Sequence, residues 1–410
     1  MTPLNSVQIT FPTADALQKR HSLQNFADTA LKAAAGFWFL VAVIGQLVFA
    51  FTVASFYGHA AVRGVFGAWD RSITRGYIPG DTMGNFAVAV HLFMAVVVIV
   101  SGVIQLIPQI RDRAPSFHRW NGRLYMLASF TISIAGLYMV WIRGTVGDVS
   151  QHVGVSLNAV LIMLCAVMAL RYALARDFKT HRRWALRLFL VVSGVWFFRV
   201  GLFLSFLIFR GPFGFDPKTF QGPFLTFLSF AQYLLPLAVL ELYMRARDGA
   251  GAPRRFAMAA GLFVLTVAMG GGIFAATMGV WLPTIKKAYD NRKSIAETLS
   301  ATIASTGVDE AARQYHHLRD VEPSTYNFDE AELNNLGYTL IRGNKFKEAI
   351  RVFQLNVEAY PQSSNAYDSL AEAYMNDGNK PLANANYQKS LQLNPNNRNA
   401  VLTLQQLNAP

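Results

Sequence analysis

Four histidines are the residues of this chain whose types and spacing could do chemistry. His91 and His152 lie near the outer ends of two apolar segments, and His118 and His181 precede two others on the inner side. A low-spin b-type haem needs two imidazoles from facing helices, one on each axial side. The helix from His91 to Pro108 is about 26 Å long at the α-helical rise, so the two pairs predict two separate haem sites.

Basic residues accompany these histidines. The intervals His91 to His118 and His152 to His181 are 27 and 29 residues, which indicates a duplicated helix pair. Arginines beside a haem balance its propionates, and an arginine within a span, which costs about 2.5–3.5 kcal/mol on insertion scales, should face the bundle interior and have a partner. The arginines that we expect to contribute are Arg119, Arg123, Arg182 and Arg187 at the inner pair, with Arg199, midway along the fifth span, near the outer pair.

A second interpretation uses the same residues without haem. Histidine and arginine are common at membrane interfaces, where they contact lipid phosphates. The alternative function is therefore a non-redox membrane scaffold, or a protein that binds lipid or a small anion. No Ser-His-Asp, HExxH or paired-carboxylate arrangement is visible, and the single cysteine, Cys165, excludes a disulfide framework and multi-cysteine metal sites.

The composition requires a membrane for the first two thirds of the chain. Of 410 residues, 53% are hydrophobic and only 15% are charged, which excludes a single soluble domain. The net charge of +13 is confined to residues 1–283, which hold 24 Lys and Arg against 10 Asp and Glu. Residues 284–410 hold 13 and 14, so the positive charge indicates membrane topology and lipid contact, with no nucleic-acid partner.

Seven apolar segments have the length that spans a bilayer, about 20 residues each. They are Ala33–Phe56, Phe86–Pro108, Leu124–Ile142, Val153–Leu170, Leu188–Phe209, Phe224–Met244 and Phe256–Leu282. Together they predict an all-α, seven-helix transmembrane bundle over residues 33–283, preceded by a cytoplasmic tail over residues 1–32 that has no features of a cleavable signal peptide.

Lysine and arginine alternate between the loops and so predict the orientation. The loops of one side hold 17 Lys and Arg, and those of the other side hold 6. The richer set is residues 1–32, 109–123, 171–187 and 245–255, and the poorer set is residues 57–85, 143–152 and 210–223. Because positive loops stay in the cytoplasm, we expect an inner-membrane protein with its N-terminus inside and its C-terminal domain in the periplasm.

The C-terminal region repeats with a period of 34 residues. The pairs that match are Leu336 and Leu370, Gly337 and Ala371, Ala349 and Ala383, Phe353 and Tyr387, and Pro361 and Pro395. Small residues allow the two helices of a hairpin to approach closely, and the aromatic residue fills the gap to the next helix. The helical stretch Ile295–Leu318 should complete the packing, and Asn399–Leu407 should form a capping helix.

This period and the run Tyr367–Tyr374 resemble the tetratricopeptide repeats fused to many bacterial hydrolases and membrane proteins. The resemblance covers about residues 295–407. It implies a soluble helical-repeat domain that binds a periplasmic protein or peptide, and it implies no catalysis.

Two further resemblances concern the membrane half. The order of the four histidines resembles that of the two-haem cytochromes b of the 561 type, in which spans two and four hold one haem and spans three and five the other. The runs His118–Tyr125 and His181–Arg187 are similar to a bacterial family of predicted multipass membrane proteins, domain of unknown function 2306, over roughly residues 35–245. That resemblance implies a membrane location and a polar cluster at the inner face, and no known reaction.

Overall fold

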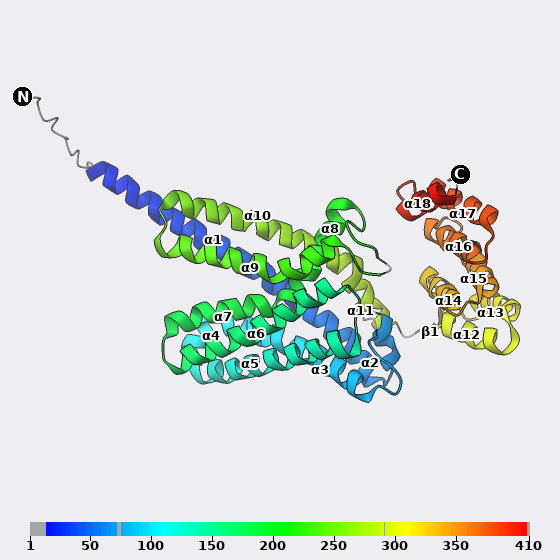
Figure 1. Cartoon of the computed structure of the whole chain (residues 1–410), viewed down its shortest axis with the longest axis horizontal. Coiled ribbons are helices and arrows are strands. Elements are labelled where there is room, and N and C mark those ends of the chain that lie inside the picture. The colour runs from blue at the N-terminus through cyan, green and yellow to red at the C-terminus, as the bar shows by residue number, and fades with distance from the viewer. Residues whose placement is uncertain (1–13, 72–74, 218, 291, 408–410) are drawn as a thin grey trace, which may run out of the picture. The chain divides into compact units, whose positions relative to one another are not determined.

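The computed structural model describes residues 14–71, 75–217, 219–290 and 292–407, and these are helical almost throughout (Figure 1). The chain divides into two compact units, which we call the membrane unit, residues 1–289, and the C-terminal unit, residues 290–410. Of the predicted N-terminal tail, residues 1–13 lie outside the described residues. The remainder of the tail is helical and continuous with the first span, in α1(Ala14–Val53).

The membrane unit consists of long helices joined by short turns. Its elements are α1(Ala14–Val53), η1(Ala54–Gly58), α2(His59–Val62), η2(Phe66–Arg71), α3(Thr82–Leu106), α4(Pro108–Arg113), α5(Pro115–Tyr138), η3(Met139–Arg143), α6(Val149–Leu174), α7(Phe178–Val192), α8(Gly194–Phe209), α9(Pro223–Gly249), α10(Ala252–Ala276), η4(Thr277–Trp281) and α11(Leu282–Ala288). Among the described residues, six helices are long and apolar enough to cross a membrane, and the bent pair α7–α8 makes a seventh crossing if it counts as one span.

The fifth span differs from the straight helix predicted over Leu188–Phe209. It begins ten residues earlier, at Phe178, and bends by 51° at Ser193. The Ser193 hydroxyl donates to the Phe189 carbonyl and accepts from Gln46 of α1 at 2.9 Å. Asn158 of α6 donates to the Val191 carbonyl at 3.1 Å. The bend falls at a Ser-Gly pair, Ser193–Gly194, a common place for a helix to kink, and buried amide side chains from two neighbouring helices support it.

Small residues bring the helices of the membrane unit close together. Figure 1 shows α10 lying beside α1, and α10 also packs with α8. Gly45 of α1 lies against the Trp196 ring of α8. A Cβ atom at Gly272 of α10 would lie 2.4 Å from the Val200 carbonyl oxygen of α8, so the glycine permits close packing of these two helices. In the other half of the unit, α3 packs against α5, α5 against α6, and α6 against α7. Gly102 of α3 faces the Tyr125 ring of α5 in the same close manner.

The C-terminal unit stacks helical hairpins in two layers. Its elements are β1(Lys293–Ser294), α12(Ile295–Thr306), α13(Val308–Val321), β2(Tyr326–Asn327), α14(Glu330–Arg342), α15(Phe346–Ala359), α16(Ser364–Asn376), α17(Lys380–Leu393) and α18(Arg398–Leu407). The first-helix layer contains α12, α14 and α16, and the second-helix layer contains α13 and α15. The predicted stretch Ile295–Leu318 is two helices, because Gly307 adopts a φ of 98° between them.

The matching positions of the 34-residue period occupy equivalent places in two hairpins. Ala349 and Ala383 are both fully buried, and Phe353 and Tyr387 are buried at 0% and 2% exposure. A Cβ at Gly337 would lie 2.4 Å from the Phe353 ring, so the glycine permits this contact between α14 and α15. Residues of α12 and α13 complete the same hydrophobic core, as expected.

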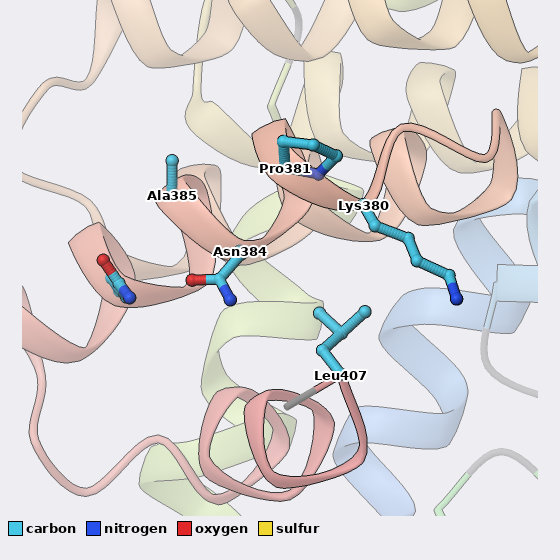
Figure 2. A pocket seen from close by; sticks show the side chains of 6 residues that line it. Lys380, Pro381, Asn384, Ala385 and Leu407 are labelled. Carbon is cyan, nitrogen blue, oxygen red and sulfur yellow. The ribbon is translucent and has the colours of Figure 1, made fainter. Parts of the chain in front are cut away.

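A shallow hollow of about 340 Å³ lies on α17 at the end of α18 (Figure 2). Its walls are Lys380, Pro381, Asn384, Ala385, Gln388 and Leu407. The hollow is wide open to solvent, and its walls carry a single charged side chain, so we assign it no ligand.

Asn356 of α15 is a destabilising residue in this core. Its side chain is fully buried, and neither amide atom has a hydrogen-bond partner among the described residues. A buried amide without partners costs about 1–3 kcal/mol. We therefore expect Asn356→Leu, which removes the polar atoms and keeps a side chain with the same branched shape, to stabilise the C-terminal unit by about that amount, measured by urea-dependent proteolysis of the full chain. A variant of lower stability than the parent chain would contradict the burial of this amide.

Candidate functional site

His118 belongs to a hydrogen-bonded network between α3 and α5. Pro115 starts α5, which places His118 in its first turn, next to the last turn of α3. Gln105 of α3 approaches Nε2 of His118 at 3.2 Å and accepts from Nδ2 of Asn121 at 2.8 Å. Asn121 also donates to the Ser101 carbonyl at 2.8 Å. The network ties the ends of the two helices together and leaves Nδ1 of His118 buried without a partner among the described residues.

His181 lies in the first turn of α7, against α6. Asp177 caps this helix by accepting from the Thr180 amide at 3.1 Å. Nδ1 of His181 lies 2.8 Å from the Ala169 carbonyl oxygen, which fixes the ring on α6. His118 is near enough for the charges of the two rings to interact, so the structure brings the predicted inner pair into one region.

The arginines of the inner region divide into paired and unpaired side chains. Arg187 forms an ion pair with Glu241 of α9 at 3.1 Å and stacks on Trp184. The other three predicted arginines are exposed and have no carboxylate partner within the described ranges: Arg119, Arg123 and Arg182. Arg123 stacks on the exposed Trp120 ring, an arrangement typical of a membrane interface.

His91 lies deeper than the sequence suggested. The helix α3 begins at Thr82, so His91 is about 14 Å along it, two and a half turns from its start. Its ring packs against Gly136 of α5, with Cε1 3.5 Å from where a Cβ would stand. Nδ1 of His91 is buried and has no hydrogen-bond partner in the described part of the chain.

His152 lies at the start of α6 in a different setting. Its Nε2 is 3.3 Å from the Val146 carbonyl oxygen, and its ring lies edge-on to Trp141 at 6.0 Å. No hydrogen bond or ring contact joins His152 to His91 among the described residues. The two histidines of the predicted outer pair therefore make separate contacts: His91 packs on α5, and His152 contacts the loop before α6.

Sequence reasoning missed an ion-pair cluster at the end of the bundle that the sequence predicted to be the outer one. Arg143, which is nearest in sequence to the predicted outer site, has a side chain only 3% exposed that pairs with Asp81 at 3.3 Å. It also donates to Oδ1 of Asn85 at 2.9 Å and to the Arg75 carbonyl at 3.0 Å. Arg75 donates back to the Arg143 carbonyl at 2.8 Å. A signal was present, because Asp81 immediately precedes α3 and caps it through the Gly84 amide.

Arg199 of α8 has no carboxylate partner within the described residues, although it lies inside a span. Its guanidinium donates to the Val195 carbonyl of its own helix at 3.2 Å and lies 5.1 Å from the Phe49 ring centre of α1. The sequence predicted that Arg199 faces the bundle interior and has a partner. The side chain contacts Phe49 but is partly exposed, and the described chain offers it no carboxylate.

The inner pair fits a bis-histidine haem only in part. A histidine ligand usually has one ring nitrogen held by a carbonyl and presents the other to the metal. His181 has this arrangement, because Ala169 holds its Nδ1 and no hydrogen bond to Nε2 is present among the described residues. His118 differs, since Gln105 engages its Nε2 and the remaining nitrogen is enclosed by protein.

Comparison with known proteins agrees with this architecture. Residues 88–235 match the profile of a family described as Predicted membrane protein (DUF2306). The matched region runs from α3 into α9 and includes all four histidines, and it is narrower than the resemblance seen in the sequence. A search of the curated proteins finds no match. The fold and the matched region together define a membrane protein with several spanning helices.

Proposed function

We propose that this chain is a membrane scaffold that presents a tetratricopeptide-like domain to a partner protein or peptide. The observation that carries the proposal is the equivalence of buried positions in two successive hairpins, α14–α15 and α16–α17. Stacked hairpins of this kind offer an extended surface made by successive helices, and such surfaces bind proteins.

Hydrogen bonds between neighbouring helices make the first-helix layer rigid. Asp368 of α16 accepts from Asn397 and Asn399, each at 2.9 Å, at the start of α18. Tyr338 of α14 donates to Glu372 of α16 at 3.0 Å. Burial raises the pKa of Tyr338, so the phenol keeps its proton and remains a donor to this carboxylate. A surface held in this way loses little entropy when a partner binds.

The membrane unit serves as the anchor in this proposal. Arg187 pairs with Glu241, and Arg183 pairs with Asp248 at 2.5 Å, so these charges hold α7 to α9. The exposed side chains of Arg119, Arg123 and Arg182 would contact lipid phosphates. With the loop charges described above, we propose an inner-membrane location with the N-terminus in the cytoplasm and the C-terminal unit in the periplasm.

Photo-crosslinking in intact cells tests the proposal. A crosslinking amino acid replaces Asn376 of α16, in the first-helix layer, or Lys347 of α15, in the second; both positions are exposed. We expect a discrete crosslinked product from the Asn376 position and not from Lys347, and we expect Phe353→Ala, which should unfold the unit, to abolish it. Absence of a product from Asn376, or equal products from both positions, would contradict a partner surface on the first-helix layer.

A second candidate function is transmembrane electron transfer by b-type haem. It is favoured by the carbonyl-held ring of His181 and by the buried, unpartnered ring nitrogens of His91 and His118. Haem would supply one-electron redox chemistry, with His118 and His181 at the inner site and His91 and His152 at the outer site. In this candidate Arg119, Arg123, Arg182 and Arg187 would face the inner propionates. It requires a redox-sensitive absorbance band that His181→Ala removes.

A further inference from the structure

Arg199 carries a positive charge at the middle of the membrane unit without a negative partner in the described chain. From Arg199 to the end of α8 at Phe209 is ten residues, or about 15 Å, which is half the thickness of a bilayer's hydrocarbon core. A side chain at this depth cannot extend to either interface. One of its five N–H groups donates to the Val195 carbonyl, and its guanidinium lies over the Phe49 ring.

A second unused donor lies on the same face of α8. Trp196 is three residues before Arg199, so the two side chains share one side of the helix. The Trp196 side chain is 3% exposed, and its indole Nε1 has no hydrogen-bond partner among the described residues. Its ring lies 2.7 Å from where a Cβ at Gly45 of α1 would stand, one turn from Phe49 on the same helix. Both donors therefore lie along the contact between α1 and α8.

The other polar groups around Arg199 supply no negative charge. His91 of α3 and Tyr57 of η1 are the titratable groups whose charges interact with it. Neither forms an anion near neutral pH in its ordinary state. The region thus combines a guanidinium with spare donors and a buried indole N–H, and its described residues offer no carboxylate to either.

We propose that Trp196 and Arg199 form an intramembrane binding site for a small monovalent anion, a halide or a carboxylate. A guanidinium and an indole N–H are both donors without acceptor capacity. Arg199 is partly exposed on the protein, so at this depth the low dielectric of the membrane interior strengthens their attraction for negative charge. The site is distinct from the exposed arginines at the inner face. It does not depend on the scaffold role of the C-terminal unit.

Chloride-35 NMR on the detergent-purified full chain tests this site. Chloride exchanging with a protein site gives a line broadening that saturates and that acetate displaces if both anions share the site. We expect such broadening for the parent chain, its loss in Arg199→Gln, and an affinity about tenfold weaker in Trp196→Phe, which removes one charge-assisted hydrogen bond and keeps an aromatic ring. Displacement by acetate at lower concentration than bromide would identify a carboxylate as the preferred ligand, and the reverse order would identify a halide.

The matched control is Arg171→Gln, which removes an exposed arginine at the end of α6 and should leave the broadening unchanged. Arg199→Lys keeps the charge and should retain part of the binding if Arg199→Gln fails to fold. Broadening that is absent from the parent chain, or that persists at full strength in both Arg199→Gln and Trp196→Phe, would overturn the proposal.

Discussion

Phe353→Ala is expected to unfold most of the C-terminal unit while the membrane unit stays intact. Phe353 is fully buried at the centre of the hydrophobic core and packs on Gly337 and Tyr338. Truncating a buried phenylalanine costs about 3–5 kcal/mol, which is a large part of the stability of a unit of this size. The measurement is urea-dependent proteolysis of the full chain in detergent.

The sequence provides an internal control for this experiment. All seven tryptophans lie in the membrane unit, the last at Trp281. Tryptophan emission should therefore not change in Phe353→Ala, and Lys347→Ala, which truncates an exposed side chain of the same helix, should match the parent chain in both measurements. Resistance to proteolysis equal to that of the parent chain would show that Phe353 is not a core residue.

Arg143→Ala is expected to produce the largest loss of stability in the membrane unit. The substitution leaves Asp81 and Asn85 without their shared donor and removes the bond from the Arg143 side chain to the Arg75 carbonyl, while the bond from Arg75 to the backbone carbonyl of residue 143 remains. Removing one partner of a buried pair costs about 3–5 kcal/mol, and we expect about 2–4 kcal/mol here because Asp81 is one-third exposed. Thermal unfolding in detergent, followed by tryptophan emission, measures the loss.

Trp69 of η2 lies close to Arg75 in the chain, so its emission can report on the segment that contacts Arg143. It is 4% exposed and donates to the Tyr57 carbonyl at 3.3 Å. Acrylamide should quench its emission more strongly in Arg143→Ala than in Arg63→Ala, which removes an exposed arginine from the same loop. Arg143→Lys should lie between the two, since lysine keeps the charge and cannot form the forked contact. Equal unfolding temperatures for Arg143→Ala and Arg63→Ala would contradict the role of the pair.

The helical architecture could be predicted because its causes are local. Runs of about 20 apolar residues identify the spans, and a 34-residue period locates the positions that pack inside the hairpins, such as Ala349 and Phe353. The Ser193–Gly194 pair in the sequence allows a bend, but the side chains that support the bend, Gln46 of α1 and Asn158 of α6, belong to other helices and could not be predicted. Gly307 was visible in the sequence, and its positive φ explains why one predicted helix is two.

The candidate site was predictable as a set of residues and not as a set of contacts. The order of the histidines placed His118 and His181 on the same side, where their rings are within range of each other. The pattern could not indicate that Gln105 would approach His118 or that His152 would turn toward the Val146 carbonyl, because these contacts depend on helix rotation and loop shape. The order of seven candidate spans determines at which end of the bundle each helix starts. It does not determine how each helix is rotated about its own axis.

A reduced-minus-oxidised visible spectrum of the purified full chain, expressed with adequate haem supply, tests the central claim most directly. The scaffold account holds that His118 and His181 bind neighbouring helices through Gln105 and the Ala169 carbonyl. It predicts a flat difference spectrum for the parent chain and for His181→Ala. A sharp b-type α-band, scaling to one or two haems per chain and lost in His118→Ala or His181→Ala, would contradict the account and establish the chain as an electron carrier.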